Sequence, residues 1–341
     1  MLHFENDYNE GAHPELLKAL LETNTENLAG YGTDYYTKRT AEKIKLACQS
    51  PDADVFFLTG GTQTNQVAIA SLLRSYEGVV TVDTGHINTH EAGAIEYTGH
   101  KVLTIPHEQG KLSAHKLKAY LEQFYQDDAK EHMVAPGMVY ISHPTEYGTL
   151  YSKAELEALA SICRHYTLPL FLDGARLSYG LAVTETDVDL PTIAELCDVF
   201  YIGGTKIGAL AGEALVFTRQ PMPKNFTSIV KQHGALLAKG RVLGVQFDRL
   251  FTDDLHLTIG RHAIKLAEQV RTILLEKGYH LYIDSPTNQQ FVIIDNSQLS
   301  KLAESMVYTI WEPYDDNRTV IRLTTSWSTT QEDVDQLREL L

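Results

Sequence analysis

The sequence has 341 residues, of which 43% are hydrophobic and 21% are charged, so the chain can bury a large core and is long enough for two domains. Its formal net charge of -15 comes with no block of lysines or arginines, which argues against nucleic acid or an anionic membrane as a partner. An anionic small molecule would need arginines gathered at one place.

The cysteines and the start of the chain indicate the compartment. Cys48, Cys163 and Cys197 are odd in number and far apart, so neither a disulfide framework nor a thiolate metal site is indicated. The first residues, MLHFENDYNEG, are acidic where a signal peptide needs a basic and then an apolar run. No apolar segment reaches about 20 residues. We therefore expect a soluble protein of the cytoplasm.

Short β-branched or aromatic runs alternate with helical patterns along most of the chain. VFFLTG is followed by TNQVAIASLLRSY, GVVTVD is followed by INTHEAGAIEYTG, and the rhythm continues to DVFYIG. Strands that are apolar on both faces and alternate with helices predict an α/β fold, with a mostly parallel sheet covered by helices. Such sheets bind ligands at the ends of their strands.

The pattern changes near residue 245. The tail predicts a helix over 257–277, two strands near YHLYID and QQFVIID, a further helix, two more strands and the final helix TQEDVDQLRELL. We expect residues 1–245 to form an N-terminal segment and the large domain. Residues 246–341 are expected to form a smaller C-terminal α+β domain.

The first strand end of interest is FLTGGTQTNQVAIA, where glycines, hydroxyl groups and an amide stand between a strand and a helix. Free amide donors at a helix N-terminus suit a phosphate group. The segment lacks the GK[ST] of a nucleotide loop and the spacing of GxGxxG, so a nucleotide is disfavoured. A helix cap without any ligand remains an alternative.

The next strand end, DTGHINTHEAGA, carries His86, His90 and Glu91. Two histidines four residues apart suggest zinc, but without a further clear ligand we predict no metal site. A histidine held by hydrogen bonds in a turn is the plain interpretation. The functional alternative is an imidazole that lies on a flat cofactor ring or moves protons.

In LPLFLDGARLSYG an apolar strand ends at Asp173, and Arg176 follows three residues later. The aspartate could cap the next helix. Alternatively, it is a fixed carboxylate that keeps a heteroaromatic nitrogen protonated, beside an arginine for a carboxylate or phosphate.

The segment YIGGTKIGALAGEALVF places Lys206 among glycines where almost no other charge occurs. This setting favours a lysine that loses its proton and bonds covalently to a ligand. The alternative is a lysine in a glycine-rich bend with its amine in solvent. The four segments follow one another along one α/β chain. Together they supply the parts needed to hold pyridoxal phosphate.

These segments, with the late VIRLTTSWS, resemble in order and approximate spacing the threonine aldolase and β-eliminating lyase family of pyridoxal-phosphate enzymes. The resemblance runs from NDYNEGAHPELL to the last helix. It implies the aspartate aminotransferase-like architecture, fold type I, with a seven-stranded large-domain sheet.

The resemblance also implies cofactor roles. Lys206 would be the Schiff-base lysine, Asp173 would pair with the pyridine nitrogen, and His86 would stack on the ring. The residues facing the phosphate would be Gly61, Thr62 and Thr205.

Substrate roles follow from the same resemblance. Arg176, which is also expected to touch the cofactor, and Arg322 would grip the substrate α-carboxylate. His132, upstream of a strand, would meet the substrate hydroxyl group. Asn6 stands where the family typically has a serine that helps to hold the substrate, and Gly-Gly-Thr precedes the lysine where a Ser-Lys-Gly run is commonest. Both departures bear on the identity of the substrate more than on the identity of the cofactor.

Tyr31 and Arg241 resemble positions that complete the site of a neighbouring subunit, with Arg241 at the cofactor and Tyr31 at the substrate. A homodimer or homotetramer with shared active sites is therefore expected.

The leading functional hypothesis is a low-specificity L-threonine aldolase, which cleaves L-threonine, L-allo-threonine and related β-hydroxy amino acids to glycine and an aldehyde. The alternative among enzymes is a pyridoxal-phosphate lyase that eliminates a β-substituent, or an aminotransferase. A third class, a non-catalytic ligand-binding protein, has no need of a Schiff-base lysine.

Overall fold

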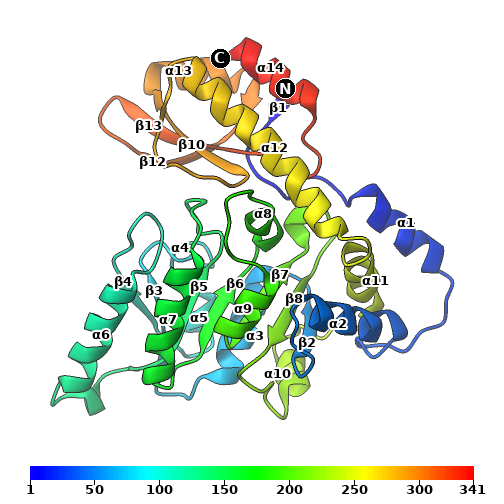
Figure 1. Cartoon of the computed structure of the whole chain (residues 1–341), viewed down its shortest axis with the longest axis vertical. Coiled ribbons are helices and arrows are strands. Elements are labelled where there is room, and N and C mark those ends of the chain that lie inside the picture. Colours follow the sequence, from blue (N-terminus) through cyan, green and yellow to red (C-terminus); the bar gives the residue numbers. More distant parts are fainter.

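The computed structural model describes all 341 residues, and its larger part is built on a seven-stranded sheet (Figure 1). The strand order is β2-β8-β7-β6-β5-β3-β4, with β8 antiparallel to both of its neighbours and all other pairs parallel. The expectation of a mostly parallel α/β sheet is confirmed. The strands are β2 (Asp54–Leu58), β3 (Glu77–Val82), β4 (Val102–Ile105), β5 (Ala135–Ser142), β6 (Leu170–Asp173), β7 (Val199–Gly203) and β8 (Glu213–Phe217).

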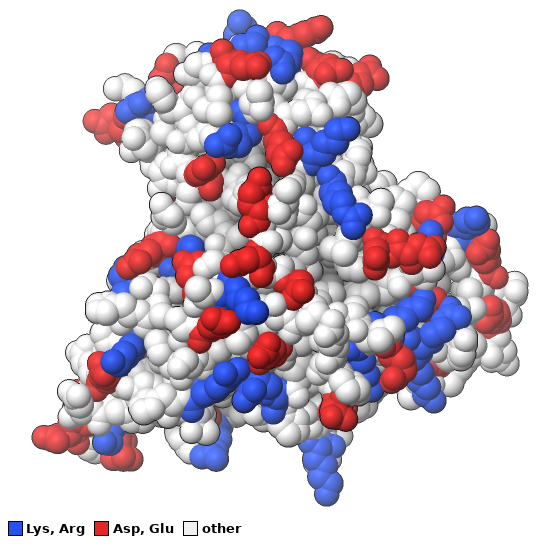
Figure 2. All heavy atoms as spheres, in the orientation of Figure 1, with Lys and Arg blue, Asp and Glu red and all other residues white.

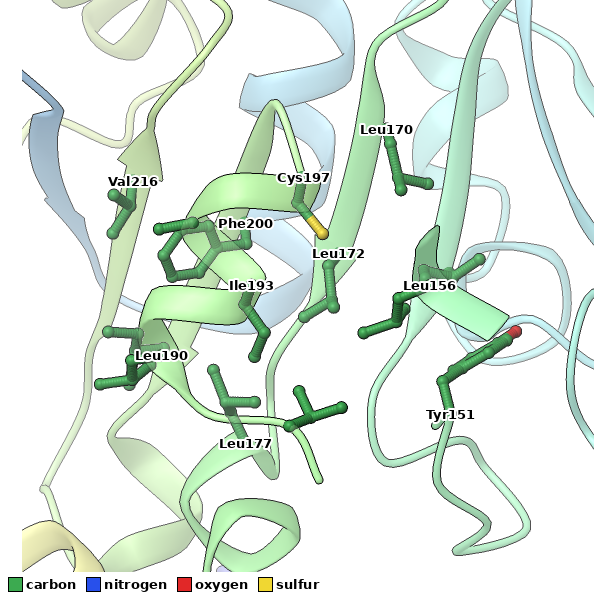
Figure 3. Close-up of a cluster of buried hydrophobic side chains, with 14 of the residues drawn as sticks. Tyr151, Leu156, Leu170, Leu172, Leu177, Leu190, Ile193, Cys197, Phe200 and Val216 are labelled. Carbon is green, nitrogen blue, oxygen red and sulfur yellow. The ribbon is translucent and has the colours of Figure 1, made fainter. Parts of the chain in front are cut away.

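Helices cover both faces of this sheet, because its central strands are apolar on both sides. Leu170 and Leu172 of β6 pack into one hydrophobic cluster, whereas Phe171 between them packs into the other. Figure 3 shows part of the first cluster, with Leu172 beside Ile193. The first face is covered by α6 (Ala114–Gln126), α7 (Lys153–His165) and α9 (Leu190–Leu196), and the second by α3 (Gly61–Leu72), α5 (Ala94–Tyr97) and α10 (Phe226–Gln232).

Three helices pack together beside the sheet: α1 (Pro14–Thr23), α2 (Tyr35–Ala47) and α11 (Arg241–Leu250). Gly244 allows α2 and α11 to meet closely, since a Cβ at this position would lie 2.3 Å from Oγ1 of Thr37. The guanidinium of Arg39 on α2 binds the carboxylate of Asp248 on α11 through two nitrogens. The helix α11 therefore belongs to the large unit over its whole length.

The C-terminal unit carries a four-stranded antiparallel sheet, in the order β12-β13-β10-β9, behind the long helix α12 (Leu255–Glu276) (Figure 1). This arrangement confirms the smaller α+β part. Its strands and helices are β9 (His280–Leu281), β10 (Gln289–Asp295), β11 (Met306–Val307), β12 (Thr309–Pro313), β13 (Arg318–Thr324), α13 (Asn296–Ala303) and α14 (Gln331–Leu340).

Two features differ from the expected division at residue 245. That position lies inside the continuous helix α11, so the chain leaves the large unit only in the loop 251–254 before α12. In addition, β1 (Leu2–His3) pairs in parallel with β11, so the first residues of the chain belong with the C-terminal unit. Helix period alone does not reveal which unit a helix packs against.

The remaining elements are short turns of helix: α4 (His86–Thr89), α8 (Leu177–Leu181) and the 3₁₀ turns η1 (Lys130–His132) and η2 (Thr205–Ile207). On the face seen in Figure 2, acidic and basic side chains are intermixed, and no continuous basic patch is visible. None of the helices combines the length and the apolar character that a membrane span requires.

Candidate active site

The carboxyl ends of β2, β5, β6 and β7 meet at one edge of the sheet, where the antiparallel strand β8 begins. A cavity of about 240 Å³ opens there. Three of the strand ends supply its principal polar groups: Thr62 after β2, Asp173 at the end of β6, and Lys206 after β7. The sequence segments that were expected to act together are therefore brought together.

Lys206 lies in η2, on a backbone path that glycine makes possible. A Cβ at Gly204 would lie 2.7 Å from the ring of Phe247 and 2.8 Å from the carbonyl oxygen of Gly212. The amine of Lys206 makes no hydrogen bond or ion pair with the protein. Burial and the nearby charge of Arg176 lower the pKa of this amine to about 8, although Asp7 and Asp173 oppose the shift. The amine is thus readily converted to its nucleophilic, neutral form.

Asp173 is buried and held by hydrogen bonds on both carboxylate oxygens. The backbone N–H of Ala175 donates to Oδ1 at 2.9 Å, and Asn65 donates to Oδ2 at 3.0 Å. The hydroxyl group of Tyr140 also donates to Oδ2. Burial would raise the pKa of this carboxyl group, but the charge of His86 and these donors outweigh it and hold the pKa below its usual value. Asp173 is therefore a fixed anion.

His86 lies at the start of α4, and Glu91 holds its ring. Nδ1 of His86 is 2.7 Å from Oε1 of Glu91, which also accepts a hydrogen bond of 2.7 Å from Asn65. Asn65 also donates a hydrogen bond to Asp173, so its side-chain amide bridges the carboxylates of Glu91 and Asp173. Burial lowers the pKa of His86, but the Glu91 contact and the charge of Asp173 raise it above the usual value.

The glycines before α3 form the other wall of the cavity. Gly60 caps the helix without a side-chain hydrogen bond, so the first amides of α3 have no acceptor within the helix. A Cβ at Gly61 would lie 3.1 Å from the hydroxyl oxygen of Tyr201. Thr62 and Thr205 also line the cavity. This wall offers an anion the donors that the sequence predicted.

A second cavity of about 330 Å³ adjoins the first and lies between the two units of the fold. His86, Arg176 and Lys206 line both cavities, and β12 and β13 contribute Trp311 and Arg322 to the second. Small ligands often bind at such junctions.

Arg322 is a buried cation with no carboxylate partner. Its Nη1 donates to Oε1 of Gln289 at 3.0 Å, and its Nη2 donates to the carbonyl oxygen of Glu5 at 3.2 Å. Nε is buried without any partner. Burial and the charge of Arg176 lower the pKa of Arg322 to about 10. A bound carboxylate would compensate this buried charge.

His132 does not reach either cavity, and the expectation that it meets the substrate is wrong within one chain. It is exposed and precedes β5, whose other end lies at the site. The eight residues of β5 span about 25 Å. A residue that precedes a parallel strand therefore lies at the edge opposite the ligand.

Three other expected residues also lie outside both cavities. Asn6 accepts a hydrogen bond from the backbone of Tyr8, and it is Tyr8 that lines the second cavity. Tyr31 is 51% exposed. Arg241 donates to the carbonyl oxygens of Thr23 and Glu26 near the end of α1. The chain neighbours of these two residues touch, since a Cβ at Gly240 would come within 2.3 Å of the backbone of Gly32. Tyr31 and Arg241 therefore lie near each other.

Sequence reasoning missed two carboxylates, Asp7 and Glu213. Asp7 is fully buried and binds Arg176 and Asn288, but nothing in the acidic run FENDYNEG singles it out. Glu213 did carry a signal, since it is the one charged residue in the apolar strand EALVF. A buried charge at a strand end usually has a partner or a function.

The chain is similar to known proteins in sequence and in fold. The family model described as β-eliminating lyase matches residues 9–307. The low specificity L-threonine aldolase of Pseudomonas aeruginosa is 31% identical over 346 residues, which cover 99% of this chain and 95% of that protein. A solved structure of Leishmania major threonine aldolase has 41% identity and a TM-score of 0.96, and the match covers 100% of this chain and 98% of that one.

More distant structures share the fold alone. The N-succinyldiaminopimelate aminotransferase of Mycobacterium tuberculosis has a TM-score of 0.72 at 14% identity, and the match covers 99% of this chain and 93% of that one. The aspartate aminotransferase-like architecture expected for the chain is therefore confirmed.

Proposed function

The chain belongs to the β-eliminating lyase family, and from that premise we propose that it is a pyridoxal 5′-phosphate-dependent aldehyde-lyase. It cleaves L-threonine, L-allo-threonine and related β-hydroxy amino acids to glycine and an aldehyde. The relatives from Pseudomonas aeruginosa and Leishmania major are both named as threonine aldolases. The observation that carries the proposal is one cavity shared by the unpartnered amine of Lys206 and the fixed carboxylate of Asp173.

The residues of the first cavity fit this cofactor. Lys206 would bond to its aldehyde carbon, and the ionised Asp173 would keep its ring nitrogen protonated. His86 would cover the ring. The phosphate would take the donors of Gly61, Thr62 and Thr205. When bound, pyridoxal phosphate supplies an electron sink that stabilises negative charge at the substrate α-carbon.

Two arginines would hold the substrate α-carboxylate. Nε of Arg322 has no partner in the protein. Arg176 donates from Nε and Nη2 to Asp7, which leaves its Nη1 for a ligand. Both side chains line the second cavity. Clamping the carboxylate orients the bonds at the α-carbon and so selects the one that breaks.

We assign to His90 the proton of the β-hydroxyl, the role that the sequence resemblance gave to His132. It lines the second cavity. Burial lowers its pKa, and the positive charges of His86 and Arg322 lower it further. A neutral imidazole can accept a proton at neutral pH. As that proton leaves, the bond between the α and β carbons opens and the aldehyde is released, and the α-carbon then takes up a proton to give glycine.

Subunit arrangement is part of the proposal. Tyr31 and Arg241 lie near each other and outside both cavities of their own chain. This position suits residues that complete the site of a neighbouring subunit, so we propose a homodimer or homotetramer. All three cysteines are buried and unpaired, which supports the prediction of a cytoplasmic location.

Product identification tests the function. Incubation with L-threonine or L-allo-threonine should release glycine and acetaldehyde in equal amounts. Elimination, which the names of the relatives do not favour, would instead release pyruvate and ammonia from serine or cysteine and no aldehyde from threonine. A protein that yields none of these products from a panel of β-hydroxy amino acids would not be the proposed lyase.

A further inference from the structure

Glu213 lines the same cavity as the three residues expected to face the phosphate, Gly61, Thr62 and Thr205. As the first residue of β8, it pairs with Leu58 at the end of β2 on one side and with Gly203 at the end of β7 on the other. The glycine segment before α3 and the Thr205 segment follow directly from those two strand ends. The sheet register thus places a carboxylate between the two chain segments that would receive the phosphate.

The Glu213 carboxylate accepts hydrogen bonds from donors that a phosphate would also use. Thr205 Oγ1 donates to Oε1 of Glu213 at 3.0 Å, and the backbone N–H of Gly204 approaches Oε2 at 3.3 Å. The residue is 3% exposed and lines the same cavity as Gly61 and Thr62. A phosphate dianion bound there would meet a second anion, and burial gives water little opportunity to screen the repulsion.

We propose that Glu213 makes cofactor binding depend on pH, because its carboxyl group takes up one proton from solvent when the cofactor phosphate binds beside it. The neutral acid can donate to a phosphate oxygen, whereas the carboxylate repels it. Each cofactor bound to ionised Glu213 therefore consumes one proton. This inference rests on the proposed cofactor site. It identifies Glu213 as a group that weakens cofactor binding at high pH.

The groups around Glu213 are consistent with this role. Burial and the charge of Asp173 raise the pKa of Glu213 to about 8, although the charge of Lys206 and the hydrogen bond from Thr205 oppose the shift. Tyr201 on β7 is the other titratable group that senses Glu213. The other titratable or charged groups that line the same cavity are His86, Glu146 and Arg176, and the residues on the segment after β2 and on α3, Thr59 and Thr62, are uncharged.

The experiment compares the wild type with Glu213→Gln, which keeps the size of the side chain and removes the titration. The dissociation constant of pyridoxal phosphate is measured by absorbance between pH 7 and pH 9. The ratio of the wild-type constant to that of the variant cancels the titrations common to both proteins. We expect this ratio to rise about tenfold between pH 7 and pH 9, as one proton must be taken up by each ionised Glu213.

Pyridoxal, which lacks the phosphate, is the matched control ligand, and its ratio should stay flat. The wild type alone gives a second measurement if Glu213→Gln does not fold. Calorimetry at pH 8.5 in two buffers of different ionisation enthalpy should show about one more proton taken up per pyridoxal phosphate than per pyridoxal.

A ratio that stays flat for pyridoxal phosphate, or rises equally for pyridoxal, would overturn the role of Glu213 and leave the proposed lyase standing. Equal proton uptake for the two ligands would do the same. A wild type that binds no pyridoxal phosphate at any pH would overturn the proposed function, and this inference with it.

Discussion

The guanidinium group of Arg176 is held by both carboxylate oxygens of Asp7, a residue 169 positions earlier in the chain. Nε donates at 2.8 Å and Nη2 donates at 2.9 Å. The side chain of Asp7 is fully buried and that of Arg176 is 12% exposed. Burial would raise the pKa of Asp7, but the charge and hydrogen bonds of Arg176 hold it below the usual value. The pair ties the start of the chain to the active site.

We predict that Asp7→Asn lowers the free energy of unfolding by about 3–5 kcal/mol, because the variant leaves a buried arginine without its counter-charge. Urea denaturation measures the change. Asp284→Asn is the control, since Asp284 binds Arg271 in an ion pair whose aspartate is 79% exposed. Asp284→Asn should lower the free energy of unfolding by only about 0–1 kcal/mol. Equal effects of the two variants would show that the Asp7 pair is not a buried pair in solution.

Arg322→Ala should weaken kcat/KM for L-threonine by about 10- to 100-fold, because a hydrogen bond to a charged group contributes about 1.5–3 kcal/mol. Steady-state kinetics measure the loss. Arg318→Ala is the control on the same strand, where Arg318 forms an exposed pair with Asp315. It should leave kcat/KM unchanged. If Arg322→Ala leaves kcat/KM unchanged, Arg322 does not bind the substrate carboxylate.

His90→Asn should lower kcat for aldol cleavage by about 100-fold or more, since a positioned general base contributes about 10²–10⁴. The absorbance of the bound cofactor should persist, which separates loss of the base from loss of the site. His132→Asn is the counterpart and should be fully active. If His132→Asn is inactive and His90→Asn is not, a neighbouring subunit supplies the base.

Much of the site could be predicted from sequence because its residues follow strand ends. Asp173 ends an apolar strand and Lys206 follows another one within glycines, so the sheet alone brings them to one edge. His132 precedes the strand β5 and so lies at its amino end, and the resemblance that suggested its role carries no information on strand direction. The same topology that brings Asp173 to the cavity takes His132 away from it.

Other features depend on contacts that no local pattern encodes. Asp7 and Arg176 are 169 positions apart in the chain, and the strand just before Asp7, β1, pairs with β11 in the other unit. The boundary expected near residue 245 falls inside α11, and close contact at Gly244 fixes that helix to α2. Packing partners, rather than propensity, decide both features.

The depressed pKa of Lys206 predicts how fast the amine reacts with pyridoxal. The rate should rise about tenfold per pH unit up to about pH 8 and then level off, because only the neutral amine attacks the aldehyde. Stopped-flow absorbance follows the reaction, and pyridoxal keeps the phosphate out of the measurement. A rate that continues to rise to pH 10 would indicate an ordinary, solvated lysine.

The central claim is that Lys206 is the residue to which the cofactor bonds. Borohydride reduction of the protein loaded with pyridoxal phosphate makes that bond permanent, and mass spectrometry of the digested chain then locates it. We predict one modified residue per chain, Lys206, and no modification in a Lys206→Ala variant. A cofactor found on any other lysine, or on none, would contradict the account.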